Sequence, residues 1–198
     1  MNSKVLFSDQ DPKSCSEIYD VLNSHQLMAL SFHDDMTDLF DFLGLEGFKC
    51  MHEYQYYSES DGHNTLKEYY LNHHDKLLSD EDLESIKVIP EDWYRYRKSE
   101  VTPSIRKQAV QKAMKQYKDW ETDTKALYER CAGYLLEWNK IADFNTVNCF
   151  IKDVDEELEN LNKLCTELEA VEYDDEYMMY MQKDYQYKYS ELLEDIGD

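Results

Sequence analysis

Two glycines three residues apart separate two long apolar patterns in the first half of the chain. They lie in segment 42–48, with the sequence FLGLEGF, and the 198 residues contain only five glycines. Glycine tolerates the left-handed conformation that ends many helices, so we expect Gly44 to follow the last residue of one helix. Apolar residues resume at Leu45, which leaves room only for a tight turn. The two helices must therefore lie antiparallel.

The helices on either side of this turn have different signals. Ser14 and Glu17 have the spacing of a capping box, which predicts that the first helix begins at residue 14. Apolar residues then recur every three or four positions up to Gly44, as in an amphipathic helix. The second helix begins near Leu45, and segment 60–62 (SDG) interrupts its pattern. A kink, a bulge and a true break are all compatible with that interruption.

The second half of the chain repeats this organisation after a long connection. Residues 79–101 show no sustained helical period, and an extended chain of that length could cross a whole helical bundle. Thr102 as N-cap and Pro103 at the first helical position predict the start of a third helix. A short break near residues 141–143 leads to a fourth helix.

The order of these elements predicts an all-α fold. Two helices joined by a tight turn are followed by a long crossover and then by two more helices joined by a tight turn. This is the order of a ferritin-like four-helix bundle with one long crossover. We expect an N-terminal tail over residues 1–13, the bundle over 14–170, and a Tyr- and Met-rich acidic segment over 171–198. That last segment is predicted to form an extra C-terminal helix. It either packs on the bundle or offers a surface to a partner, because tyrosine and methionine are enriched at interfaces.

Charge and cysteine content limit the partners and the compartment. The formal charge of −22 argues against nucleic acid or an anionic membrane as a direct partner. It is compatible with attraction of cations, with simple solubility, and with docking to a basic protein. The five cysteines are dispersed and contain no CxxC pair, which indicates reduced thiols in a cytoplasmic protein and neither a disulfide framework nor a zinc site. No signal-peptide core or membrane span is present in the sequence, so we expect a soluble protein.

Several passages resemble prokaryotic nonhaem ferritin in their order and spacing. Segment 42–48 is similar to that family's turn between its first two helices. Residues 88–90 (VIP), followed by Trp93, resemble the Ile-Pro…Trp passage of its crossover. Residues 139–145 (NKIADFN) and then 150–151 resemble its junction between the third and fourth helices.

The acids of the fourth helix extend the resemblance. Asp153, Glu156 and Glu157 follow the junction at the spacing of that family's acidic fourth helix, and the similarity covers about residues 22–165. It implies a di-iron centre that oxidises ferrous iron inside the bundle. Such centres use inward-facing carboxylates and a Glu-x-x-His pair, whose members share one helix face.

Counting from the turn and the junction transfers the ligands one at a time. The glutamates of the second and third helices fall on Glu59 and Glu121. The glutamate of the first helix falls on Gln26, a neutral and poor ligand. The histidine of the second helix falls on Gly62, and the adjacent His63 could serve if the backbone bulges there.

The fourth helix and a nearby histidine complete the candidate set. Val154 occupies a position where a polar ligand is expected, while Glu156 and Glu157 remain close by. His33 faces roughly the same way as Gln26, seven residues earlier, and could therefore replace the lost ligand. About half of the family's site is retained.

Two functions from different classes follow. In the first, the metal site is degenerate, no cofactor is bound, and the chain acts through self-association or through binding a basic protein. In the second, the chain is an iron-binding ferroxidase or iron-storage protein with a non-standard di-iron or mononuclear site. The candidate ligands for that site are Glu59, His63, Glu121, Glu156 and Glu157. Loss of the anionic ligand at Gln26 favours the first, because two adjacent ferrous ions need several negative ligands.

Overall fold

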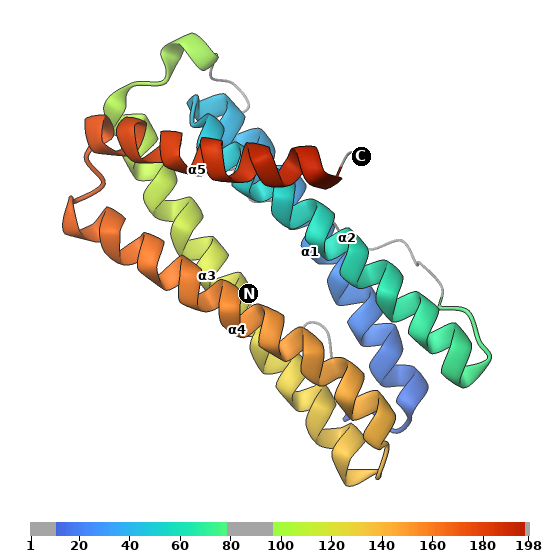
Figure 1. The fold of residues 1–198 in the computed structure, drawn as a ribbon. Helices are drawn as coiled ribbons and strands as arrows, with labels where there is room; N and C mark the ends of the chain where they lie inside the picture. The colour runs from blue at the N-terminus through green and yellow to red at the C-terminus, as the bar shows by residue number, and fades with distance from the viewer. Residues whose placement is uncertain (1–10, 79–96, 197–198) are drawn as a thin grey trace.

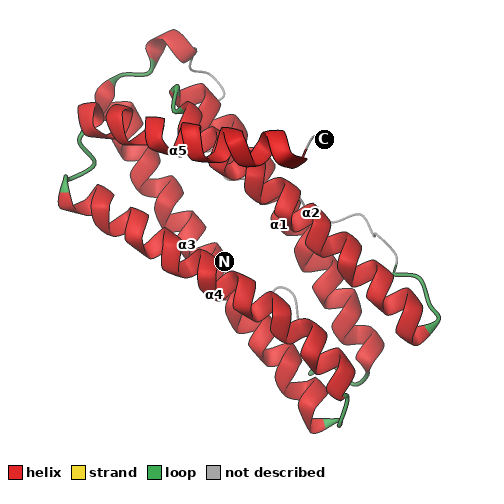
Figure 2. Ribbon diagram, in the orientation of Figure 1, coloured by secondary structure: helices red, strands yellow, loops and turns green. Residues whose placement is uncertain are grey.

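The computed structural model describes residues 11–78 and 97–196, and they are helical with short connections (Figures 1 and 2). The helices are α1 (Cys15–Leu43), α2 (Glu46–His74), the short 3₁₀ helix η3 (Lys98–Glu100), α3 (Pro103–Glu137), α4 (Ile141–Ala170) and α5 (Asp175–Ile196). No strand occurs in these ranges, which confirms the all-α prediction. The sequence passages at 88–90 and Trp93, and most of the expected N-terminal tail, lie outside the described residues.

The turn between α1 and α2 has the predicted geometry. Gly44 has φ 72°, in the left-handed region, and its N–H bonds to the Phe40 and Asp41 carbonyl oxygens at the end of α1. At the other end of α1, the Ser14 side chain accepts a hydrogen bond from the Glu17 N–H. These local signals therefore fix both ends of α1.

Helix α2 is continuous through segment 60–62, so of the three alternatives for this segment a true break does not occur. Beyond that segment Leu66 and Tyr70 are buried, at 0% and 2% exposure. Burial of one face against the neighbouring helices supplies most of the stability of a protein helix, and here it outweighs the weak propensity of Ser, Asp and Gly.

Helix α3 begins as predicted, but it ends three residues before the expected break. The Thr102 side chain accepts the Ile105 N–H, and Pro103 occupies the first helical position. The turn to α4 lies at residues 138–140, where Asn139 has φ 56° and the Lys140 N–H bonds to the Leu135 carbonyl. Asparagine is the residue after glycine that most readily ends a helix in this way.

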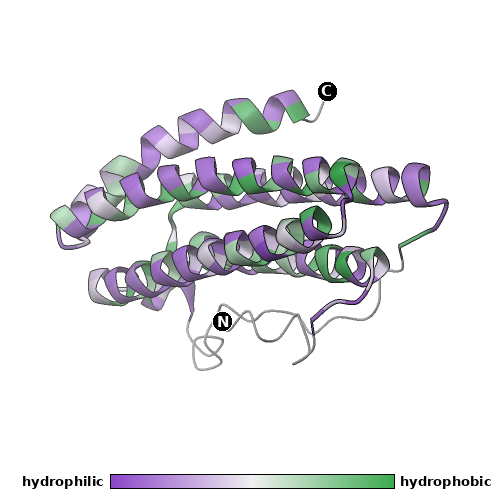
Figure 3. Cartoon of the chain, turned by 90° about the horizontal axis from the view of Figure 1, so that it is seen from below, coloured by the Kyte–Doolittle hydropathy of each residue, from purple (hydrophilic) through white to green (hydrophobic). Residues whose placement is uncertain are grey.

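The long helices form two antiparallel hairpins, α1–α2 and α3–α4, which lie side by side (Figure 1). A perpendicular view shows α5 as a further layer outside the α1–α2 hairpin (Figure 3). Helix α5 packs on α2 and buries Met178, Met181 and Tyr189, whereas Tyr180 and Tyr187 are exposed. The C-terminal segment thus packs on the helical body through both methionines and tyrosines, while Tyr180 and Tyr187 remain at the surface.

Two apolar clusters form the interior. One lies near the α1–α2 turn and beneath α5, and we call it the turn-side core. The other lies toward the opposite end, and we call it the far core. Large members of the turn-side core are Phe32, Phe40, Phe48, Met114 and Leu164. Members of the far core include Leu22, Leu66, Leu127, Leu135 and Val147.

Buried polar side chains lie between the two cores on three helices, among them Gln26 of α1, His63 of α2 and Glu121 of α3. In the described ranges no helix combines the length and apolar character needed to cross a membrane.

Candidate functional site

Three carboxylates from three helices lie between the two cores, and we call them the carboxylate cluster: Glu59 of α2, Glu121 of α3 and Glu157 of α4. Glu121 is fully buried, and neither of its carboxylate oxygens has a hydrogen-bond partner in the described structure. No Lys or Arg within the described residues forms an ion pair with any of the three. A buried carboxylate without a partner is costly, so this is an unusual arrangement for a core.

Burial, with repulsion from neighbouring carboxylates at Glu59 and Glu121, raises the pKa of all three carboxyl groups. Burial, followed by the charges of Glu157 and Asp153, raises the pKa of Glu59 to about 8. Burial raises the pKa of Glu157 to about 7. The pKa of Glu121 is raised well above its usual range by burial, then by the charges of Glu157 and Glu59. The cluster therefore favours any bound positive charge, whether a proton or a metal ion.

His33 of α1 completes the group. One ligand atom each from His33, Glu121 and Glu157 lies within 4.8 Å of the others. The Nδ1 atoms of His33 and His52 are 3.0 Å apart, so one ring donates to the other. Burial lowers the pKa of His33 to about 3, which keeps the ring neutral. His33 Nε2 has no partner in the described residues and is the nitrogen open to a ligand.

Neighbouring side chains hold Glu157 in position. The Tyr117 hydroxyl donates to Glu157 Oε1, and Gln55 Nε2 donates to the same oxygen over 2.7 Å. His52 of α2 orients His33 through the hydrogen bond between their Nδ1 atoms. Metal ligands in proteins usually have such oriented partners, and their role is to fix the ligand's direction and basicity.

A cavity of about 430 Å³ between α2 and α4 reaches the cluster. Its wall includes Gln26, Glu59 and Glu157, and also the exposed residues Asp61 and Asp153. Because acidic residues stand on its solvent side, the cavity offers a negatively charged route from solvent to the carboxylates.

The structure brings together some of the predicted ligands and separates others. Glu59, Glu121 and Glu157 converge. His63 is buried but its Nε2 lies 2.9 Å from Asn23 Oδ1 of α1, away from the cluster. Helix α2 does not bulge at Gly62, and successive residues on a helix diverge by about 100°, so His63 cannot take the place of residue 62.

Glu156 is separated from Glu157 for the same reason. It is exposed on the outer face of α4, while Glu157 turns inward. The suggestion that His33 replaces the ligand lost at Gln26 agrees with its position beside Glu121 and Glu157. Gln26 itself is buried, and its Oε1 has no partner among the described residues.

Sequence reasoning missed Tyr117 and the part played by His52. Tyr117 precedes Glu121 by four residues, and His52 precedes Glu59 by seven, so helical spacing placed each pair on one face. Spacing alone did not distinguish these two from the many other polar residues at similar intervals.

Neither protein-family models nor curated protein sequences yield a match to this chain.

Proposed function

We propose that the chain is a ferritin-like helical bundle that binds a divalent metal ion through His33, Glu121 and Glu157, with Glu59 as an additional carboxylate. The observation that carries this proposal is the fully buried Glu121 carboxylate without a hydrogen-bond partner. A cation between it, Glu157 and His33 Nε2 would satisfy all three groups at once. One imidazole with two or three carboxylates suits Fe²⁺ or Mn²⁺.

Charge balance favours one ion over two. A single divalent ion neutralises Glu121 and Glu157, and Glu59, whose pKa is raised to about 8, can keep its proton at neutral pH. A second ion would need further anionic ligands, and Gln26 provides none. The proposal is therefore a mononuclear form of the iron-binding alternative, without a place for the ferroxidase pair.

The chain's own residues have defined roles in this site. Glu121 and Glu157 bind the ion, Tyr117 and Gln55 orient Glu157, and the cavity admits ions from solvent. Ferrous iron bound there would supply one-electron chemistry with dioxygen. If the protein instead stores iron, the same residues would be the site at which the iron first binds.

Metal analysis of Glu121→Gln tests the proposal. The protein is stripped with a chelator, loaded anaerobically with ferrous ion and, separately, with Mn²⁺, and then desalted. We expect close to one Mn²⁺ per chain in the wild type, because Mn²⁺ prefers carboxylate to thiolate ligands. After the substitution we expect a loss of at least about tenfold in affinity, the scale seen when a group that supports a metal ligand is lost. The exposed neighbour Glu156→Gln is the matched control and should bind like the wild type.

Two results would contradict the proposal: a folded wild-type protein that retains neither ion, or Glu121→Gln binding as tightly as the wild type. Glu121→Gln should fold, because the amide is a neutral group of nearly the same shape as the protonated carboxyl that it replaces, and circular dichroism checks this. The role as an acidic binding or assembly protein stays a prediction, which a light-scattering mass would address.

A further inference from the structure

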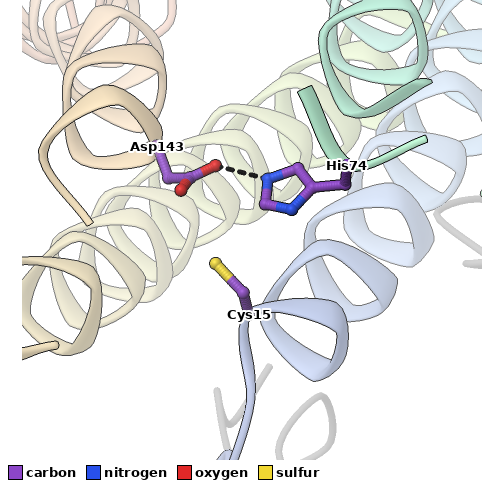
Figure 4. A group of neighbouring side chains, drawn as sticks. All are labelled: Cys15, His74 and Asp143. Carbon is purple, nitrogen blue, oxygen red and sulfur yellow. Dashed lines mark hydrogen bonds and ion pairs between the residues drawn. The ribbon is translucent and has the colours of Figure 1, made fainter. Parts of the chain in front are cut away.

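A second group of metal-ligating side chains lies at the end of the molecule away from α5. Cys15 is the first residue of α1, His74 is the last of α2, and Asp143 is in the first turn of α4 (Figure 4). One ligand atom from each lies within 4.8 Å of the other two. These residues are far apart in sequence, so cysteine spacing gives no sign of the group.

We propose that Cys15, His74 and Asp143 form a zinc site that joins the ends of α1, α2 and α4. Thiolate, imidazole and carboxylate are the three ligand types that zinc takes in proteins. Three protein ligands leave the fourth tetrahedral position to water, which fits a group whose cysteine and histidine are only partly buried.

The distances are close to those a zinc ion requires. His74 Nε2 and Asp143 Oδ1 are 2.7 Å apart, so the two side chains already face each other. Two N or O ligands of a tetrahedral zinc, each about 2.0 Å from the metal, are separated by about 3.3 Å. The thiol must approach by about 1 Å from the upper limit of 4.8 Å, which a side-chain rotation at a helix end can supply.

The helix ends favour the charged form of both anionic ligands. Cys15 and Asp143 sit in the first turns of α1 and α4, where the helix dipole stabilises negative charge. Without a cation, burial and the Asp143 charge raise the pKa of the Cys15 thiol to about 11, although Lys140 acts in the opposite direction. A divalent ion between the thiolate and the carboxylate removes that repulsion, and the thiol proton passes to solvent.

Asp143 is held in place before any ion binds. Its Oδ1 accepts hydrogen bonds from the Tyr19 hydroxyl over 2.9 Å and from the Tyr69 hydroxyl over 3.4 Å, in addition to the His74 contact. Such donors around a ligating carboxylate fix its orientation and strengthen metal sites.

A nucleophilic Cys-His-Asp triad is the other chemistry that these residue types suggest. A catalytic thiol needs a lowered pKa, produced by a neighbouring cation or imidazolium. Here burial and the Asp143 charge raise the pKa of Cys15, so the thiol is not an activated nucleophile in the metal-free protein.

Cobalt substitution distinguishes this site from the carboxylate cluster, which contains no sulfur. The 198-residue chain is reduced, stripped of metal and titrated with Co²⁺ under nitrogen. We expect a thiolate-to-cobalt charge-transfer band in the near ultraviolet that one equivalent of Zn²⁺ abolishes. Cys15→Ser and His74→Gln should lose the band, whereas Cys149→Ser, at an exposed cysteine of α4, and Glu121→Gln should keep it.

A second measurement uses the wild type alone and so does not depend on whether a variant folds. Zn²⁺ should slow alkylation of Cys15 at least about tenfold relative to Cys149, as followed by peptide mass spectrometry, because a coordinated thiolate is withdrawn from reaction. The proposal is overturned if the folded wild type shows no thiolate band, if Cys15→Ser retains it, or if Zn²⁺ leaves the alkylation of Cys15 unchanged. Retention of the band in Glu121→Gln also makes the test independent of the carboxylate site.

Discussion

Gly47, the second glycine of segment 42–48, should tolerate no side chain because α5 crosses directly over it. A Cβ added at Gly47 would lie 1.7 Å from the Gln182 carbonyl oxygen and 2.8 Å from the Gln186 nitrogen. Both are backbone atoms, so no rotamer change relieves the overlap. The Gly47 N–H also donates to Gln182 Oε1 over 2.6 Å, which ties the start of α2 to α5.

The expected cost of Gly47→Ala follows from this geometry. A carbon and an oxygen need about 3.2 Å, so α5 must move outward by about 1.5 Å, and overpacking of this kind costs about 1–3 kcal/mol. The shift also loosens Met178 and Met181, whose full burial is worth about 2 kcal/mol each. The higher helix propensity of alanine relative to glycine offsets about 1 kcal/mol of this loss in stability. We expect a net loss of about 2 kcal/mol in the free energy of unfolding.

Gly133→Ala is the matched control, since Gly133 lies inside α3 with no atom within 4 Å of an added Cβ. This variant should gain about 1 kcal/mol from helix propensity alone. Denaturant unfolding measures both changes, and amide hydrogen exchange should show faster exchange along α5 in Gly47→Ala only. If Gly47→Ala proves as stable as Gly133→Ala, α5 does not pack on Gly47 as described.

Two further expectations concern charged groups. The pKa of Glu59 is raised to about 8 from its ordinary 4.5, so metal-free folded protein retains a proton that the unfolded chain releases, and stability falls as pH rises between these values. From pH 5.5 to 8 the free energy of unfolding should fall by up to about 3 kcal/mol. Glu59→Gln should remove this pH dependence, and the exposed Glu156→Gln should not. The prediction is wrong if denaturant unfolding gives both variants the same dependence of stability on pH. Arg106 donates from Nε to the Leu43 carbonyl over 2.9 Å and pairs with Asp175 at 2.6 Å, joining α3 to the α1–α2 turn and to α5. Arg106→Met should therefore lower the free energy of unfolding by about 1–3 kcal/mol in the same assay, and an unchanged midpoint would show that these contacts contribute nothing.

Local signals in the sequence predicted the helix ends well, and tertiary packing decided the remainder. Gly44 and the Thr102-Pro103 pair act through backbone geometry within one turn, so they can be read from a few residues. The continuity of α2 depends on Leu66 and Tyr70 meeting residues from other helices. No local pattern contains that information, and segment 60–62 was therefore given too much weight.

The candidate site also contains residues that the sequence predicted and residues that only tertiary packing determined. Glu59, Glu121 and Glu157 were found by counting from the turn and the junction, because helical rise fixes the level of a residue along the axis. Which of two adjacent residues faces inward depends on the rotation of each helix, and packing sets that rotation. His63 and Glu156 consequently lie off the site, one position from where an inward-facing ligand would stand.

The carboxylate cluster is better explained by binding than by folding. The turn-side core and the far core each bury large apolar side chains, and position 121 of α3 lies between residues of the two clusters. Instead a carboxyl group stands there with both oxygens unpaired in the described structure, beside two others whose pKa burial also raises. Each such group lowers the stability of the metal-free protein, and buried groups of this kind are typical of functional sites. A bound cation would offset that cost. Addition of Mn²⁺, which prefers carboxylate to thiolate ligands, should therefore stabilise the wild type at pH 8 and have a much smaller effect on Glu121→Gln.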